Sequence, residues 1–285
     1  MNPLVSVIIP TLNRSDLLSQ AIKSVECQTY NNIEIIIIDD CSDDIVFASS
    51  DIHPLTVYRN SKRMGGAYSR NKGVSLSKGH YVCFLDDDDI YMPDKISFLL
   101  KSFNKYKSAS AIFGLVIKKG DVINNRNKNK YLSDGQKVTS VGAIGGLHTN
   151  GSLIKREIFD DISFLTKLRK YQDTQLHFEL IKSKSVIFCD FIVSEWNYEH
   201  EQGQVTDTKT LHQHSNGIKN FITFEDYIKE KYELSAYERW YFRKRKVYLL
   251  AKAKIHFNDF KSPIKLSFSE YVMMKVFWAY FRFVK

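Results

Sequence analysis

Short apolar runs rich in β-branched residues recur through the first third of the chain. Val5–Ile9 is closed by Pro10, while Ile33–Ile38 and Tyr81–Leu85 are each followed at once by aspartates. These runs are continuously apolar rather than alternating, which predicts strands buried on both faces, as in a parallel sheet.

Between the predicted strands, apolar residues recur with helical spacing. Cap-type residues at 13–16 precede one stripe, and Pro93 precedes a second. The stripes are Leu17, Leu18, Ala21, Ile22 and Val25, and then Ile96, Leu99, Leu100 and Phe103. Strands that alternate with helices predict an α/β fold with a mainly parallel central sheet and helices on both faces. Ligands bind at the carboxyl ends of strands in such sheets, so the polar residues after the strands are expected to converge.

The charge is unevenly distributed. The net charge is +9, and residues 229–285 contain 14 Lys or Arg against 5 Asp or Glu, whereas residues 1–228 contain 27 of each. The sequence therefore predicts a neutral body, 1–228, and a basic, aromatic, helical appendage, 229–285.

The spacing of the cysteines and the lengths of the apolar runs indicate the cellular compartment. The four cysteines are widely spaced with no C-x-x-C pair, which predicts reduced thiols in a cytosolic protein. The apolar run Leu4–Ile9 has neither a basic residue before it nor a small-residue cleavage site after it, so it predicts a strand rather than a signal peptide. No run of about 18 uncharged apolar residues occurs, so a transmembrane helix is not expected.

Four consecutive carboxylates, Asp86–Asp89, need a cation or solvent to offset their repulsion. A solvated loop is the simple alternative, but this run lies between Tyr81–Leu85 and the apolar residues 90–92. Hard oxygen ligands in that setting suit Mg²⁺ or Mn²⁺, which shares its shell with phosphate oxygens. A D-x-D phosphatase with a nucleophilic aspartate is another alternative, although such motifs usually follow the first strand. Neither a P-loop nor a dinucleotide-binding glycine motif is present.

In order and spacing, four segments resemble the family 2 glycosyltransferases, which are inverting enzymes with the GT-A fold. The segments are V-S-V-I-I-P-T-L-N-R at 5–14, I-I-I-I-D-D-C-S-D-D at 35–44, N-S-K-R-M-G-G-A-Y-S-R-N-K-G at 60–73 and G-H-Y-V-C-F-L-D-D-D-D-I at 79–90. The resemblance covers about residues 4–205. It implies a donor half at about 1–110 and an acceptor half at about 111–228.

The resemblance also implies a donor site for a UDP-sugar. By position, Pro10, Thr11 and Asn13 would line the nucleoside pocket, and Asp40 would contact the uracil. Arg63 or Arg70 would contact the diphosphate. Asp86 or Asp87 would contact the ribose, and Asp88 would bind the metal. Three of the nearby residues have simpler alternatives. Asn13 could cap a helix, Arg70 could form a structural ion pair, and Asp89 could only shape the turn toward Pro93.

By the same resemblance, an aspartate that opens a later helix acts as the general base. Asp173 matches that position, although Gln172 stands where the family usually has Glu; a helix N-cap is the alternative role for Asp173. His200 resembles a late histidine near the metal, with an ordinary loop residue as the alternative. His212 and His214 are expected in a solvated loop, and Gly151-Ser152 matches a segment on the acceptor side or is simply a strand edge.

The appendage contains two further signals. Arg239-Trp240 resembles the end of the Q-x-x-R-W motif of processive synthases, but Ala236 replaces the glutamine, which disfavours processivity. The apolar stretch Val272–Val284, with Lys275, is too short to span a bilayer and predicts an interfacial helix on an anionic membrane. Packing of the tail onto the body is the alternative, and nucleic-acid binding is not expected.

These observations predict an inverting, non-processive transferase that uses Mn²⁺ or Mg²⁺. It would move a hexose from a UDP-sugar to a growing, polyprenyl-diphosphate-linked glycan in bacterial surface polysaccharide synthesis. The expected location is the cytoplasmic face of the inner membrane, as a peripheral protein. The alternatives are a D-x-D phosphatase and a non-catalytic module that binds nucleotide sugars.

Overall fold

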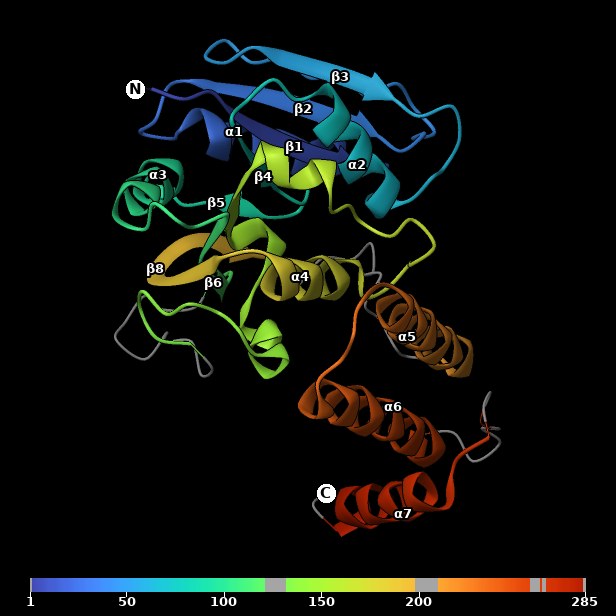
Figure 1. Ribbon diagram of the computed structural model, residues 1–285. Helices are drawn as coiled ribbons and strands as arrows, with labels where there is room; N and C mark the ends of the chain where they lie inside the picture. The colour runs from blue at the N-terminus through green and yellow to red at the C-terminus, as the bar shows by residue number, and fades with distance from the viewer. Residues whose placement is uncertain (1, 121–131, 198–209, 257–261, 263–264, 284–285) are drawn as a thin grey trace. The chain divides into compact units, whose positions relative to one another are not determined.

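Strands and helices alternate along most of the chain (Figure 1). The computed structural model describes residues 2–120, 132–197, 210–256, 262 and 265–283. The strands are β1 (Val5–Thr11), β2 (Ile33–Asp39), β3 (Leu55–Arg59), β4 (Tyr81–Phe84), β5 (Ile90–Tyr91), β6 (Ala111–Lys118), β7 (Ser152–Lys155) and β8 (Val186–Trp196). The α-helices are α1 (Ser15–Glu26), α2 (Gly66–Leu76), α3 (Lys95–Lys105), α4 (Gln172–Ser183), α5 (Leu211–Lys231), α6 (Ala236–His256) and α7 (Phe268–Phe283). The short 3₁₀ helices are η1 (Val141–Gly146), η2 (Thr149–Gly151) and η3 (Arg156–Asp160).

The chain forms two compact units. The first comprises residues 1–166 and 172–201, and the second comprises residues 167–171 and 202–285. Residue 228, where the sequence suggested a division, lies inside α5, and α5 belongs to the second unit.

All eight strands of the first unit form one sheet in the order β3-β2-β1-β4-β7-β6-β8-β5. The strands β3, β2, β1 and β4 are mutually parallel, as expected for the donor half. The second half is mixed, because β7 pairs antiparallel with both β4 and β6, while β6 and β8 are parallel. The first strand also continues through Pro10 to Thr11 instead of ending before the proline. The expected α/β fold is thus confirmed, with a more mixed sheet than the sequence suggested.

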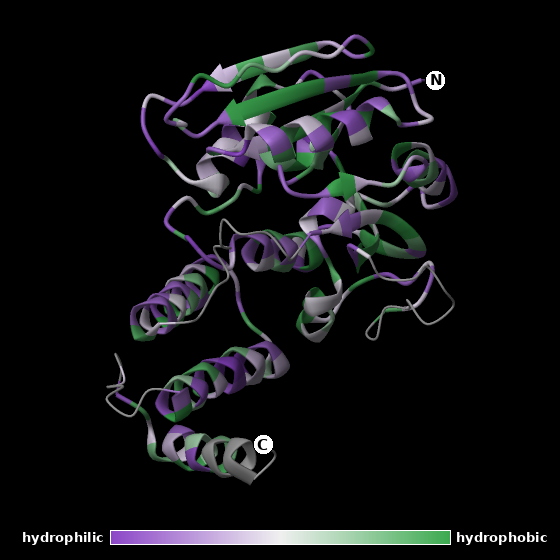
Figure 2. Ribbon diagram, turned by 180° about the vertical axis from the view of Figure 1, so that it is seen from behind, coloured by the Kyte–Doolittle hydropathy of each residue, from purple (hydrophilic) through white to green (hydrophobic). Residues whose placement is uncertain are grey.

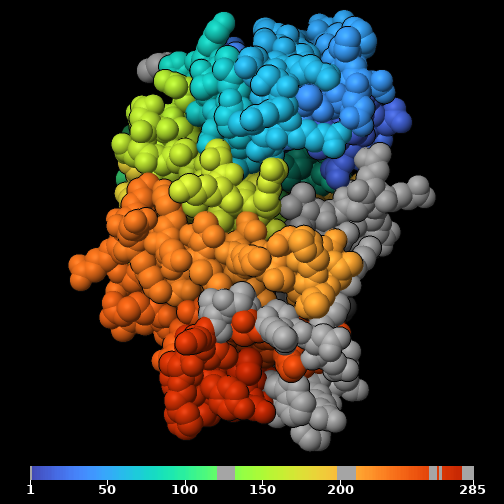
Figure 3. Space-filling view, turned by 90° about the vertical axis from the view of Figure 1, so that its right-hand side faces the viewer, coloured from blue at the N-terminus to red at the C-terminus, as the bar shows by residue number. Residues whose placement is uncertain are grey.

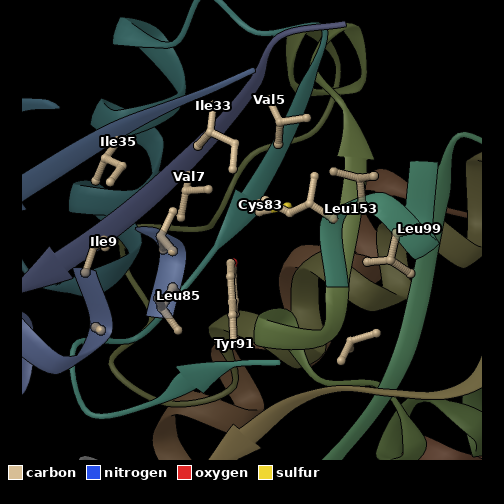
Figure 4. Close-up of a cluster of buried hydrophobic side chains, with 14 of the residues drawn as sticks. Val5, Val7, Ile9, Ile33, Ile35, Cys83, Leu85, Tyr91, Leu99 and Leu153 are labelled. Atoms are coloured by element: carbon tan, nitrogen blue, oxygen red, sulfur yellow. The ribbon is translucent and has the colours of Figure 1, made fainter. Parts of the chain in front are cut away.

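Both faces of the parallel half are buried, which explains its continuously apolar strands. Val5, Val7 and Ile9 of β1 face one cluster, which includes Leu99 of α3, whereas Ile8 faces a second cluster (Figure 4). In Figure 2 the central strands are mostly hydrophobic, whereas the helices contain both hydrophilic and hydrophobic residues. The second face is closely packed, since a Cβ at Gly73 of α2 would lie 2.3 Å from Cγ2 of Ile8.

The second unit consists mainly of α5, α6 and α7. Its interior contains Phe221, Phe224 and Phe242 together with the buried carboxylate of Glu225, which pairs with Lys229 at 2.5 Å and Lys246 at 3.3 Å. The helix α5 begins after a capping box formed by Thr210 and Gln213, so the polar segment around His212 and His214 is helical and not a solvated loop. None of the described helices is both long and apolar enough to cross a membrane.

Candidate active site

The ends of β1 and β4 meet through a direct hydrogen bond. Thr11 Oγ1 donates to Asp87 Oδ2 at 2.8 Å, although the two residues are 76 positions apart. The polar residues that follow these neighbouring parallel strands therefore converge, as the sheet geometry requires.

Asp40, which follows β2, holds the start of α2. One of its carboxylate oxygens accepts hydrogen bonds from Asn60 Nδ2 at 2.8 Å and Met64 N at 2.7 Å, and the other accepts from Gly65 N at 2.7 Å. Gly65 has φ +92°, a left-handed conformation that favours glycine, and it is the N-cap of α2. Asp40 thus fixes the loop that presents the first turn of α2.

Arg70, on α2, connects the acidic run to the start of α4. Its Nη2 lies 2.5 Å from Asp86 Oδ1, and its Nη1 donates to Gln172 Oε1 at 3.2 Å. A Cβ at Gly66 would lie 3.0 Å from Arg70 Nη1 and 3.4 Å from the Gln172 oxygen, so glycine leaves room for this contact. The ion pair suggested as an alternative for Arg70 is present, and its partner is one of the candidate donor-site carboxylates.

Arg14 is a member of this site that the sequence did not single out. Its Nη1 lies 3.1 Å from Asp87 Oδ1 and 3.0 Å from Asp88 Oδ2. Burial raises the pKa of Asp87 to about 6, although Arg14 and the Thr11 hydroxyl oppose the shift. The guanidinium therefore offsets the charge of two adjacent, largely buried carboxylates.

Asp89 has a different environment from the other three. It is 1% exposed, and its carboxylate accepts hydrogen bonds from Asn150 Nδ2 and from Asn197 N, the latter at 2.9 Å. Burial, together with the neighbouring carboxylates, raises the pKa of Asp89 to about 9. Its side-chain partners lie 61 and 108 positions along the chain and not in the turn toward Pro93.

Asp173 is the second residue of α4, which begins at Gln172, so it is not the N-cap of this helix. Its Oδ1 atom is buried and has no hydrogen-bond partner among the described residues. Such an atom loses the hydrogen bonds that it would make to water and gains none in return. A carboxylate oxygen in that state can accept a hydrogen bond from a donor group of a bound molecule.

His148 and Trp196 form an aromatic pair that the sequence did not single out. The His148 and Trp196 rings lie 5.9 Å apart, and His148 is exposed although its neighbours Leu147 and Thr149 are buried. Burial in the wider surroundings lowers the pKa of His148, and the charges of Asp173 and Asp86 oppose that shift. A histidine flanked by two such carboxylates has no local signature in the sequence.

The remaining predicted residues have simpler placements. Asn13 has φ +57° and exchanges hydrogen bonds with Asp43; the N-cap of α1 is Arg14, so the capping role suggested for Asn13 is wrong. Arg63 pairs with the same Asp43 at 2.8 Å on an exposed surface. His200 lies outside the described residues. Gly151 and Ser152 lie at the junction of η2 and β7.

The chemistry of the acidic run fits a divalent cation that takes few protein ligands. Within the described part of the chain, no group of three or more His, Cys, Asp or Glu converges as a closed metal cage. Asp88 offers a hard carboxylate oxygen beside Asp87. A cation with so few protein ligands completes its coordination shell with phosphate and water oxygens. That is the coordination expected for Mg²⁺ or Mn²⁺ bound together with a diphosphate.

Comparisons with known proteins point the same way. The family described as "Glycosyl transferase family 2" matches residues 6–163. An uncharacterized glycosyltransferase of Haemophilus influenzae is 28% identical over 277 residues, which cover 90% of each chain. The UDP-Glc:alpha-D-GlcNAc-diphosphoundecaprenol beta-1,3-glucosyltransferase WfgD of Escherichia coli is 29% identical over 217 residues, or 72% of this chain and 81% of that protein.

Solved structures share the fold at low sequence identity. A fragment of Staphylococcus aureus TarS, residues 1–349 in complex with UDP-GlcNAc, superposes with a TM-score of 0.62 at 16% identity, and the match covers 95% of this chain and 78% of that fragment. The Pyrobaculum calidifontis mannosyltransferase PcManGT, with GDP-Man and Mn²⁺, gives a TM-score of 0.61 at 14% identity and covers 99% and 81%. The GT-A fold expected from the resemblance is thereby confirmed.

Proposed function

Because the chain belongs to glycosyl transferase family 2, we propose that it moves a hexose from a UDP-sugar to a glycan hydroxyl with inversion and without processivity. The observation that carries this proposal is the buried, unpartnered Oδ1 of Asp173, close to the acidic run. The D-x-D phosphatase considered from the sequence is set aside, because the family and its named relatives are glycosyltransferases.

The donor would lie along the carboxyl ends of β1, β2 and β4. Pro10, Thr11 and Asn13 would line the nucleoside pocket, and Asp40 could accept the N3–H of uracil through the Oδ2 atom that receives one hydrogen bond from Gly65. Asp86 or Asp87 would face the ribose, and a cationic side chain such as Arg70 or Arg63 would meet the diphosphate.

Asp88 would hold the divalent cation, with His200 as a second candidate ligand. When bound, Mn²⁺ or Mg²⁺ stabilises the negative charge that develops on the departing nucleoside diphosphate. The fit rests on the hard carboxylate oxygen of Asp88 beside Asp87, and the Mn²⁺ complex of the mannosyltransferase neighbour agrees with it.

Asp173 would act as the general base on the acceptor. Its free Oδ1 would take the proton of the acceptor hydroxyl as the hydroxyl oxygen forms a bond to the anomeric carbon. The bond from that carbon to the diphosphate oxygen breaks on the opposite face, so the configuration is inverted. The exposed His148 and the half-buried Trp196 would border the acceptor on this side.

UDP release from a panel of UDP-sugars, with and without Mn²⁺, tests the proposal directly. Asp173→Asn is expected to lower transfer by about 10²-fold to 10⁴-fold, the usual contribution of a general base, while UDP affinity stays within about twofold. Asp161→Asn is the matched control, because Asp161 is exposed and pairs with Lys184 on the surface. Equal loss of UDP binding in Asp173→Asn would remove Asp173 as the base, and UDP binding without any turnover of the wild type would indicate a binding module.

We further propose that the second unit contacts an anionic membrane surface. Phe268, Val272 and Val276 of α7 recur at four-residue intervals, share one face and are 84%, 45% and 63% exposed. The α7 end of the chain is the red surface in Figure 3. On α6, Lys244 Nζ lies 4.7 Å from the ring centroid of the exposed Trp240, an aromatic and cationic pair suited to the lipid headgroup region.

This location would bring the enzyme to an acceptor carried on a polyprenyl diphosphate lipid. The relative WfgD acts, by its name, on a sugar linked to diphosphoundecaprenol. The proposed setting is therefore the cytoplasmic face of a bacterial inner membrane, in the synthesis of a surface polysaccharide.

A further inference from the structure

The Asn150 side chain holds the acidic run at both ends. Its Oδ1 accepts the Asp86 backbone N–H at 3.4 Å, and its Nδ2 donates to the Asp89 carboxylate. The first and last residues of the run are therefore tied to one amide, which is itself only 4% exposed.

Asn150 is in turn held from behind by a buried lysine. Lys95 Nζ donates to the Asn150 backbone oxygen and lies 3.5 Å from the centroid of the Tyr91 ring. The Lys95 side chain is completely buried. A buried ammonium group is costly unless it is hydrogen-bonded, so a lysine here indicates that the position of this backbone oxygen is strongly constrained.

The same turn contacts the helix of the proposed base. Thr149 Oγ1 lies 3.2 Å from His177 Nε2, and His177 is one turn beyond Asp173 on α4. A Cβ at Gly151 would lie 2.8 Å from the Gly114 oxygen, so the turn is also pressed closely against β6. Residues 149–151 thus connect the acidic run, α4 and the sheet.

From these contacts we propose that Asn150 is a positioning residue that holds residues 86–89 in their cation-binding shape, and that Asp89 anchors the run and does not ligate the metal. This inference rests on the proposed function, since it assigns roles around the same cation. Asp89 already accepts from Asn150 and Asn197, whereas the Asp88 carboxylate next to it pairs with the Arg14 guanidinium at 3.0 Å.

Exchanging the two side chains tests this assignment. In the double variant Asp89→Asn/Asn150→Asp, the new amide at position 89 can donate to the new carboxylate at position 150 and accept from Asn197 N. The new carboxylate at position 150 can also accept the Asp86 N–H. Every hydrogen bond of residues 89 and 150 is therefore retained, while the negative charge moves from position 89 to position 150. A metal ligand at position 89 would instead be lost.

The readout is UDP affinity by titration calorimetry, in Mn²⁺ and in EDTA. Asn150→Ala and Asp89→Asn are each expected to weaken Mn²⁺-dependent binding by about 10-fold to 100-fold, as for residues that orient metal ligands, with little change in EDTA. The double variant should recover to within about threefold of the wild type. Asn220→Ala is the matched control, because Asn220 also holds two backbone groups, accepting from Arg169 N at 2.6 Å and donating to the Asn216 oxygen at 2.8 Å, and belongs to the second unit.

The outcomes separate the two proposals. A folded double variant that binds as weakly as Asp89→Asn would overturn the positioning role and make Asp89 a ligand. If the double variant does not fold, Asn150→Ala decides alone: equal losses in Mn²⁺ and EDTA, or no loss, contradict the inference. Wild-type protein that binds no UDP in Mn²⁺ would contradict the proposed function and this inference with it.

Discussion

The Arg14 guanidinium lies 3.0 Å from the Asp88 carboxylate and 3.1 Å from that of Asp87. It therefore stands beside the oxygen atoms that the proposed cation would use. In the absence of metal it supplies the compensating charge, and a divalent ion must compete with it. Arg14 and the metal are consequently expected to oppose one another in binding.

Arg14→Gln should strengthen the binding of Mn²⁺ in the absence of nucleotide by roughly tenfold, the equivalent of about 1.4 kcal/mol, because a competing cation is removed. Calorimetric titration with Mn²⁺ alone measures the change. Lys23→Gln, on the exposed side of the same helix, removes the same charge and controls for net charge. Unchanged or weaker Mn²⁺ binding in Arg14→Gln would contradict the competition.

Lys95 gives the fold a specific dependence on pH. Burial lowers the pKa of Lys95 to about 7, although the nearby Cys83 and Asp89 oppose the shift. The unfolded chain keeps this proton up to about pH 10, so between pH 7 and 10 unfolding takes up a proton and the native state gains stability as pH rises. Lys95→Met lacks that gain.

The Tm of the wild type minus the Tm of Lys95→Met should therefore increase from pH 7 to pH 10. Cys83 and Asp89 are present in both proteins, so their own titrations largely cancel in this difference. Lys101→Met, at an exposed position of the same helix, is the matched control for the loss of one lysine. A flat profile for Lys95→Met would show that Lys95 keeps its proton in the folded protein.

Gly73 is expected to be intolerant of even one methyl group. Its Cβ would lie 2.3 Å from Ile8 Cγ2 and 3.1 Å from Cγ1, between α2 and the central strand β1. Gly73→Ala should lower the free energy of unfolding by about 1–3 kcal/mol through overpacking. Adding Ile8→Ala makes room, so the double variant should lose less than the sum of the two single losses, as measured by denaturant titration. Strict additivity would argue against the clash.

The proposed membrane surface can be tested by charge. Val272→Asp/Val276→Asp should weaken binding to vesicles that contain phosphatidylglycerol by at least about tenfold, because it places two carboxylates on the exposed face of α7. Ile45→Asp/Phe47→Asp is the matched control, since these side chains are 68% and 87% exposed in the first unit and the charge change is the same. Equal binding of both variants in a sedimentation assay would exclude this surface.

The sequence predicted the donor half of the fold well, because its signals are local. Continuous apolar runs identify β1, β2 and β4, and parallel pairing follows from the helices between them. The other side of the sheet, from β7 to β5, was harder to predict. The strand β7 is four residues long and β5 only two, too short for a periodicity to register, so the antiparallel pairings were not foreseen.

The candidate site residues also differ in how far local sequence signals reveal them. Aspartates at strand ends could be recognised because their position follows from the strands themselves. Arg14 and Asn150 could not, since their roles depend on contacts to residues 74 and 61 positions away, respectively. No spacing rule distinguishes an arginine that neutralises a distant carboxylate from one that lies in solvent.

The unpartnered oxygen of Asp173 also bears on the thermal limit of the protein. A buried acceptor without a donor costs the native state about 1–3 kcal/mol. Selection for heat resistance alone would replace Asp173 with an apolar residue of similar size. On the proposed function, the protein melts at a lower temperature than it would with an apolar residue at position 173, because one carboxylate oxygen is left open for the acceptor.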